Sequence, residues 1–261
     1  MRNVKLTLSY DGSDFCGYQI QKGFRSVQEE IQKALSEILQ DDITVIGAGR
    51  TDSGVHALAQ VVNFHHNKNI SPKNFVTGLN HFLPDDIRII SAKEVDLKFH
   101  SRFDAISKTY EYVIFNDVFM PPIYRKYKEH IPYKLDLSNM EKSLEYFCGE
   151  HDFSAFRMAA KDVVNPIRTV DEFNMEVFDK EIIFTVKGRS FLRNMVRIMV
   201  GTVIDVGLGT KSFSEIESII ESKDRSFAGR TLGACGLYLK EIVWRRHPRP
   251  ERPTGGARGL C

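Results

Sequence analysis

The stretch that most constrains this chain is GAGRTDSGVHA, at residues 47–57. Mostly apolar segments enter it (43–46) and leave it (58–64), which predicts a tight loop between two β-strands. Its three glycines let the backbone adopt positive φ angles and approach a partner closely. The loop also carries Arg50, Thr51 and Asp52, and loops held by rigid strands are common places for catalytic groups. Asp52 is therefore the first candidate catalytic residue.

The composition predicts a globular protein and excludes several other classes. A length of 261 residues allows one large domain or two smaller ones. The formal net charge is only +2, so a nucleic-acid partner would have to bind a local basic surface. The N-terminus lacks a signal-peptide profile, and no apolar run approaches membrane-spanning length. We therefore expect a cytoplasmic location and no membrane contact.

The cysteines and histidines do not predict a metal site. The four cysteines lie far apart without CxxC or Cys/His spacing, which argues for reduced thiols and against a zinc site or a disulfide framework. His65 and His66 are adjacent on a predicted strand and point to opposite faces, which is poor ligand geometry even with His56 nearby. No Gly-Lys-Ser/Thr follows the glycines around Arg50, so the loop is not a nucleotide phosphate loop.

Hydrophobic periodicity predicts a mixed order of strands and helices in both halves of the chain. Ser26 with Glu29 forms a capping box, and Ser71-Pro72 opens a second helix with proline at its first position. In the first half we expect a strand at 4–10, a helix from 26, the two strands around the loop, a helix at 71–83 and a strand at 86–95. In the second half we expect a strand from 107, an irregular segment at 120–134, a helix at 138–148, a hairpin at 167–178 and 181–187, helices at 190–206 and from 212, and a strand at 237–244.

This order predicts an α+β fold, in which two pseudo-repeated halves form a largely antiparallel central sheet flanked by helices. We place the boundaries at 1–103 for the N-terminal half and 104–244 for the C-terminal half. Residues 245–261 are rich in Arg, Pro and Gly and should form a flexible basic tail. Its five arginines are either solvated or in contact with RNA phosphates.

Two candidate residues of the second half have more than one interpretation. Helical spacing places Arg193 and Arg197 on one face of an apolar helix, and a buried guanidinium needs an anion. That anion is a structural carboxylate, a phosphate, or a catalytic carboxylate that the arginine keeps ionised. Tyr110, on its strand, is either a core residue or an aromatic platform or proton-transfer group facing a cleft.

At this point several ordered motifs resemble the TruA family of tRNA pseudouridine synthases. The loop RTDSGVHA (50–57) resembles the family signature, and the match extends from position 10 to 239. The other motifs are YDG and GYQ (10–12, 17–19), RFDA and KTYEY (102–105, 108–112), HDFSAF (151–156), FL and NMVR (191–192, 194–197), and AG and GLYL (228–229, 236–239).

The resemblance implies isomerisation of uridine to pseudouridine in the anticodon stem-loop of tRNA. It implies that Asp52 is the essential catalytic aspartate, that Tyr110 packs on the target base, and that Arg197 pairs with Asp52 in an active-site cleft between the halves. Leu237 is expected to line the uracil pocket. The family forms homodimers whose tRNA spans both subunits, so a homodimer is implied as well.

Two further residues of the loop are predicted to bind substrate. If Arg197 is the partner of Asp52, Arg50 is available to bind the RNA backbone or the flipped nucleotide. His56 is predicted to bind substrate as well. The basic aromatic segment 124–134 is either an additional RNA contact or a solvated loop.

The implied reaction agrees with the residues present. Breaking the C1′–N1 bond and rejoining the uracil through C5 consumes no redox equivalents, so we expect no cofactor and no metal. Asp52 acts either as a nucleophile or as the base that removes a ribose proton. The alternatives are an RNA-binding protein that has lost catalysis and a metal-dependent hydrolase that uses the histidines.

Overall fold

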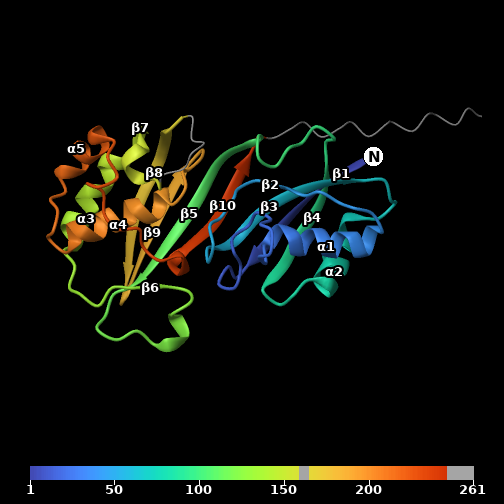
Figure 1. The fold of residues 1–261 in the computed structure, drawn as a ribbon, viewed down its shortest axis with the longest axis horizontal. Coiled ribbons are helices and arrows are strands. Elements are labelled where there is room, and N and C mark those ends of the chain that lie inside the picture. The colour runs from blue at the N-terminus through green and yellow to red at the C-terminus, as the bar shows by residue number, and fades with distance from the viewer. Residues whose placement is uncertain (159–164, 246–261) are drawn as a thin grey trace, which may run out of the picture.

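One sheet runs along the molecule, and helices gather in two groups over its halves (Figure 1). The structure is a computed structural model that describes residues 1–158 and 165–245. Within these ranges the sheet has ten strands in the order β4-β1-β3-β10-β5-β9-β8-β7, with β2 paired to β3 and β6 to β5. Strand pairs are antiparallel except β10 with β3 and β5 with β6. The predicted α+β fold with a largely antiparallel sheet is confirmed.

The N-terminal half contains four strands and two helices of the described chain. Helix α1 (Val27–Leu39) begins at Ser26, whose side chain accepts a hydrogen bond from the Glu29 N–H, as the capping box predicts. Its apolar face is buried in the core. The elements in order are β1 (Arg2–Tyr10), α1, β2 (Ile46–Gly47), β3 (His56–His66), α2 (Pro72–Phe82) and β4 (Ile87–Val95).

The C-terminal half repeats this mixture of strands and helices. Its strands are β5 (Ala105–Phe115), β6 (Glu129–His130), β7 (Gly149–Asp152), β8 (Ile167–Phe178), β9 (Glu181–Gly188) and β10 (Leu237–Trp244). Its α-helices are α3 (Leu137–Leu144), α4 (Met195–Gly207) and α5 (Glu215–Ser222), and short 3-10 turns lie at Pro122–Tyr124, Glu145–Phe147, Phe153–Phe156 and Ala234–Gly236.

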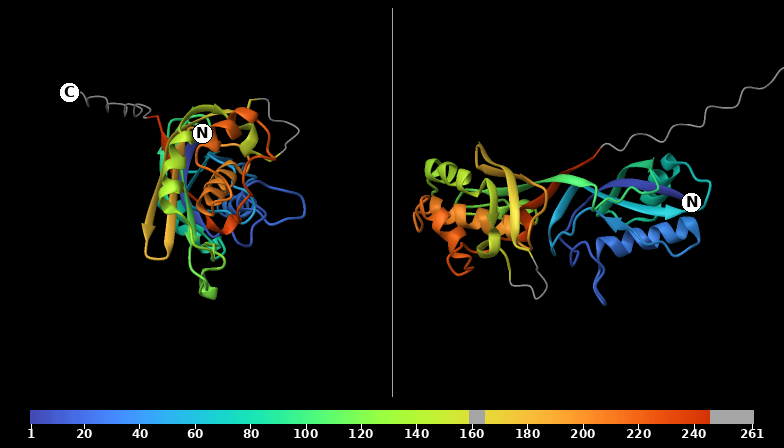
Figure 2. Two further views of the ribbon diagram at one scale, coloured as in Figure 1. Left: turned by 90° about the vertical axis from the view of Figure 1, so that its left-hand side faces the viewer. Right: turned by 90° about the horizontal axis from the view of Figure 1, so that it is seen from above.

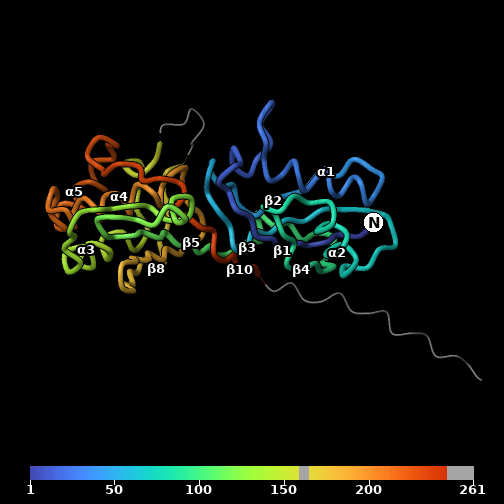
Figure 3. Tube along the Cα trace, turned by 90° about the horizontal axis from the view of Figure 1, so that it is seen from below, coloured from blue at the N-terminus to red at the C-terminus, as the bar shows by residue number. Residues whose placement is uncertain are grey.

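Strand β10 joins the two halves. It pairs antiparallel with β5 on one side and parallel with β3 on the other, where Tyr238 lies opposite His56 and Leu239 opposite Ala57. Seen from above, β5 and β10 lie between the two groups of helices (Figure 2). From below, β3 and β10 meet at the middle of the molecule (Figure 3). The last described strand therefore brings the start of β3, where the Asp52 loop ends, against the C-terminal half.

Some predicted boundaries were wrong, and one error affects the site. The helix predicted at 190–206 begins only at Met195, because Asn194 adopts a left-handed φ of 60° and the chain before it is not helical. Arg193 therefore precedes α4 and does not share a helical face with Arg197. The strand that enters the loop is also shorter than predicted, since only Ile46–Gly47 pairs with β3. Of the predicted tail, residues 246–261 lie outside the described chain. The boundary between the two halves, placed between residues 103 and 104, stays a prediction.

The closing segment that leads to β10 packs tightly against α4. A Cβ added to Gly201 would lie 2.0 Å from the carbonyl oxygen of Arg230, so only glycine allows this approach. The Thr202 hydroxyl accepts a hydrogen bond of 2.8 Å from the Gly229 N–H. These contacts fix where β10 begins and hence where the two halves meet.

Two helical glycines test this packing with the same substitution. We expect Gly201→Ala to lower the free energy of unfolding by about 1–3 kcal/mol, because the new methyl group meets backbone. Gly78 is the matched control, since a Cβ there would meet only the tip of Ile38 at 3.1 Å. Gly78→Ala should be neutral or stabilising by up to about 1 kcal/mol. Urea unfolding measures both, and equal effects of the two substitutions would contradict the packing argument.

Candidate active site

The Asp52 loop is bonded to the end of β1 and to the chain that follows it, residues 10–18. The Tyr10 hydroxyl lies 2.8 Å from the Thr51 hydroxyl, and the Tyr18 N–H donates to the Thr51 carbonyl at 3.1 Å. On the other side of Asp52, the Ser53 hydroxyl donates to the Phe15 carbonyl at 3.1 Å. Both neighbours of Asp52 are thus bonded to the same segment, which fixes the backbone from which its carboxylate projects.

Glycines make this close contact between the two segments possible. A Cβ on Gly12 would lie 2.0 Å from the Val55 carbonyl oxygen, and one on Gly17 would lie 2.8 Å from the Thr51 carbonyl oxygen. Gly17 also has a φ of 95°, a region that residues with side chains rarely adopt. The YDG and GYQ motifs therefore contribute backbone shape to the site.

Asp52 contacts Arg193, and its predicted pairing with Arg197 stays a prediction. Arg193 Nε lies 3.8 Å from Asp52 Oδ1, too far for a hydrogen bond but close enough for an ion pair. The two side chains are 63% and 33% exposed, so water weakens their attraction. Arg193 reaches the loop because Asn194 interrupts the predicted helix and leaves Arg193 on the connecting segment.

Arg197 instead bonds to neutral oxygens. Its Nε donates to the Leu232 carbonyl at 2.7 Å, and its Nη1 donates to Asn194 Oδ1 at 3.1 Å. No ion pair of Arg197 is found within 1–158 and 165–245. The guanidinium is half-buried and anchors the segment that leads to β10, and among the described residues no anion is bonded to it.

Tyr110 lies on β5 next to this junction. Its side chain is buried, and its ring meets Phe191 edge to face with centroids 5.2 Å apart. Burial raises the pKa of Tyr110 well above its ordinary value, and the nearby Tyr10 and the negative charge of Asp52 raise it further. The hydroxyl therefore stays protonated at neutral pH and is able to donate a hydrogen bond.

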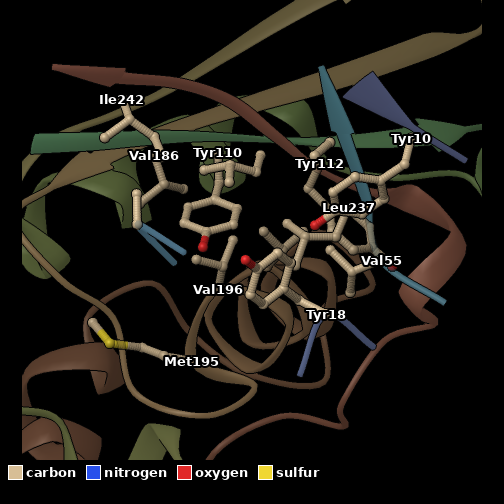
Figure 4. Close-up of a cluster of buried hydrophobic side chains, with 14 of the residues drawn as sticks. Tyr10, Tyr18, Val55, Tyr110, Tyr112, Val186, Met195, Val196, Leu237 and Ile242 are labelled. Carbon is tan, nitrogen blue, oxygen red and sulfur yellow. The ribbon is translucent and has the colours of Figure 1, made fainter. Parts of the chain in front are cut away.

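Leu237 and Tyr110 belong to the same cluster of buried apolar side chains. Leu237 is the first residue of β10, pairs in register with Tyr112 on β5, and is only 6% exposed. Figure 4 shows Leu237 in one group with Tyr110 and with Tyr18, which lies in the chain that follows β1. Side chains from both halves thus pack together around Tyr110.

His56 is buried, with both ring nitrogens bonded inside the protein. The Gly12 N–H donates to Nδ1 at 3.0 Å, and Nε2 lies 2.9 Å from the Lys126 carbonyl oxygen. The first bond makes Nδ1 an acceptor, so the ring is neutral with its proton on Nε2. Burial lowers the pKa of His56, although nearby Asp11 opposes this effect. The ring stacks on Tyr238 of β10 at 4.8 Å, so it joins three segments at the junction.

The remaining predicted residues lie on the surface around this centre. Arg50 is exposed. In the segment 124–134, Lys126 pairs with Asp14 at 3.2 Å and Lys128 pairs with Glu181, whereas Arg125 is exposed. Sequence reasoning passed over Lys108, which strand alternation places on the same face of β5 as Tyr110. That alternation was the signal available for finding it.

Over 1–158 and 165–245, no group of three or more His, Cys, Asp or Glu side chains has the geometry to hold a metal ion. His65 bonds to the Leu97 carbonyl at 3.2 Å, and His66 is buried between aromatic rings. None of the helices in the same ranges has the length and apolar character needed to cross a membrane.

The junction around His56 predicts a pH dependence of stability. Because folding lowers the pKa of His56 from its ordinary 6.5, the unfolded chain takes up a proton first as the pH falls below about 6.5. Stability is therefore full above that pH and decreases below it. His56→Gln should reduce the slope of unfolding free energy against pH between about 6.5 and 5, measured by urea unfolding.

Two other histidines define the limits of that experiment. The pKa of His66 is also lowered, chiefly by burial, so part of the slope should remain in the His56 variant. His81 is exposed at the end of α2, and His81→Gln serves as the control. If the His56 and His81 variants have the same slope as the parent, the neutral buried state assigned to His56 is wrong.

Comparison with known proteins gives a consistent set of relatives. The family model described as tRNA pseudouridine synthase matches residues 7–104 and 144–244. A tRNA pseudouridine synthase A from Finegoldia magna is 46% identical over 244 residues, which cover 94% of this chain and 100% of the relative. One of the same name from Acetivibrio thermocellus is 45% identical with the same coverage. A solved Cbf5–Nop10–Gar1 complex matches 90% of this chain and 57% of the solved chain with a TM-score of 0.37 and 11% identity, too weak a likeness to support an argument.

Proposed function

This chain belongs to the tRNA pseudouridine synthase family, an isomerase family, and we propose that it acts on uridine in the anticodon stem-loop of tRNA with Asp52 as the catalytic carboxylate. One observation carries the assignment of Asp52. Its carboxylate projects from a loop fixed on both sides by hydrogen bonds and is one-third exposed beside Tyr110 and Arg193 of the other half. A reactive group held on a rigid frame yet open to substrate is what catalysis at a ribose or base requires.

The target uridine has to leave the base stack before any group reaches its glycosidic bond. Tyr110 offers a buried aromatic ring with a protonated hydroxyl, and Leu237 offers an apolar wall next to it. We propose that the flipped uracil lies against these two side chains. In that position Asp52 attacks the ribose or the base as a nucleophile, or removes a ribose proton as a base. The C1′–N1 bond breaks, the uracil turns, and C5 bonds to C1′, which releases Asp52 from any bond that it formed. C5 then loses its proton and N1 gains one, so that the product is an isomer of the substrate.

Asp52 has to stay ionised when substrate excludes water from its surroundings. Arg193 at 3.8 Å supplies a positive charge in the free protein. Arg197 is the partner that the family resemblance implies, and the support for it here is that its bonded partners are neutral oxygens. We propose that Arg197 becomes the principal counter-charge once the substrate has closed the site.

The assignment of Asp52 is tested by a substitution that keeps its size and removes its charge. Asp52→Asn should lower the rate of tritium release from tRNA labelled at uridine C5 by about 10²–10⁴-fold or more, because an amide acts neither as a nucleophile nor as a base. Asp85→Asn is the control, since Asp85 is fully exposed in the turn before β4. Parental rates in the Asp52 variant would refute the catalytic role, and an inactive parent would refute the proposed reaction.

The two arginines are compared by single-turnover rates with saturating enzyme. Arg197→Met should lower the rate by about 10²-fold or more, as expected when a principal electrostatic contact is lost. Arg193→Met should lower it by about tenfold or less, because exposed ion pairs contribute about 1 kcal/mol or less. Arg197→Lys, with a thermal unfolding curve for each variant, separates lost charge from lost anchoring of Leu232. A larger effect of Arg193 than of Arg197 would make Arg193 the partner.

The proposal extends to partners and location. tRNA is the substrate, and exposed Arg50 is placed to contact its backbone or the flipped nucleotide. Arg125 and Lys134 are exposed cations with which the segment 124–134 would contact RNA outside the site. His56 supports the substrate site from inside the protein, because its side chain is only 3% exposed. The homodimer rests on the family resemblance, and the cytoplasmic location rests on the sequence composition.

A further inference from the structure

Lys108 carries an ammonium group that the reaction as described does not use. It lies on β5 two residues before Tyr110, and its side chain is half-buried. Its neighbours in register are Gly188 on β9 and Ile242 on β10, neither of which has a charge. The flanking strands therefore supply no carboxylate at this level of the sheet.

The ammonium lies against the Asp52 loop. A Cβ added to Gly49 would be 3.4 Å from Lys108 Nζ and 3.9 Å from the Tyr110 hydroxyl oxygen. Both polar atoms therefore lie beside Gly49, three residues before Asp52 in the same loop. Lys108 and Tyr110 thus place an ammonium group and a hydroxyl group beside the backbone that leads to Asp52.

Lys108 is bonded to no acceptor within residues 1–158 and 165–245. Comparable lysines in this protein have partners: Lys128 pairs with Glu181, and Lys5 lies over the ring of Trp244 at 4.9 Å. Burial, helped by the positive charge of Arg102, lowers the pKa of Lys108 to about 8. At neutral pH the group is still mostly charged, and a partly buried charge without a partner is favourable only when an anion joins it.

The charges around Lys108 indicate which anion. Its electrostatic neighbour is a second cation, the exposed Arg102, so the two repel each other until a negative group lies near them. A tRNA substrate brings phosphates, and lysine binds a phosphate as a compact point charge. If the base of the flipped nucleotide lies on Tyr110, the phosphates on either side of that nucleotide lie near Lys108.

We propose that Lys108, assisted by Arg102, binds a backbone phosphate that flanks the flipped target uridine. This inference rests on the proposed function and adds a positioning contact to it. The bond anchors the nucleotide through its backbone while Tyr110 and Leu237 contact its base. Its effect is on binding and placement of the nucleotide, and the chemical step remains with Asp52.

The contact predicts a pH dependence with a definite sign. The groups that face Lys108 are the guanidinium of Arg102 and the hydroxyl of Tyr110, whose raised pKa keeps it neutral; Asp52 lies further along the loop. Deprotonation of Lys108 in the free enzyme should lower kcat/KM as the pH rises through about 8. A bound phosphate raises the pKa of the lysine, so kcat should not follow the same curve.

The test combines enzyme variants with altered tRNA. Lys108→Met removes the charge at similar length, Lys108→Arg keeps it, and Lys33→Met on the exposed face of α1 is the control. Lys108→Met should weaken tRNA binding about tenfold, reduce the salt slope of binding by about 1, and leave kcat within about threefold. Lys108→Arg should restore binding and abolish the decline of kcat/KM near pH 8.

A neutral methylphosphonate placed in turn at each phosphate flanking the target uridine identifies the contact. At one of the two positions it should weaken binding to the parent about tenfold and leave the affinity of Lys108→Met unchanged. Equal losses in both proteins, unchanged binding by Lys108→Met, or a lost kcat with unchanged KM would overturn the proposal. If the parent forms no pseudouridine, the proposed function fails, while the binding comparison still decides whether Lys108 contacts a flanking phosphate.

Discussion

The candidate site depends on the position of β10 between the two halves of the sheet. Its parallel pairing with β3 covers only the two residue pairs that begin with Tyr238 and His56, directly after the Asp52 loop. Its antiparallel pairing with β5 covers the stretch that carries Tyr110. A strand from the end of the described chain therefore sets the distance between a carboxylate from one half and an aromatic ring from the other. The Gly201 contact and the Arg197 bond to Leu232 hold the segment that starts this strand.

Around this junction, rigidity and unsatisfied charge are separated in space. The backbone near Asp52 is bonded on both sides, and His56 below it is buried and neutral. Two cations of the C-terminal half lack a bonded anion among the described residues. Arg197 bonds to neutral oxygens, and Lys108 has no acceptor. A site of this kind is stable without substrate and attracts an anionic one, because the missing negative charge is what the RNA backbone supplies.

Local periodicity predicted much of the fold, and long-range geometry limited the rest. Alternation predicted the last strand at 237–244, the bounds that β10 has, because one face of that strand is buried. The start of α4 was missed since an apolar run does not reveal the left-handed φ of Asn194. That single angle changes which arginine lies near Asp52. The insertion of β10 between the halves depends on contacts far apart in sequence, which no local pattern encodes.

We propose that both halves of the chain assemble one site for a flipped uridine at this junction. A crystal structure of the Asp52→Asn protein bound to tRNA is the sharpest test of this site. We expect an unstacked uridine with its base against Tyr110 and Leu237, its ribose facing residue 52, and one flanking phosphate beside Lys108. A tRNA bound with its target base elsewhere, or contacting only one half of the molecule, would contradict it.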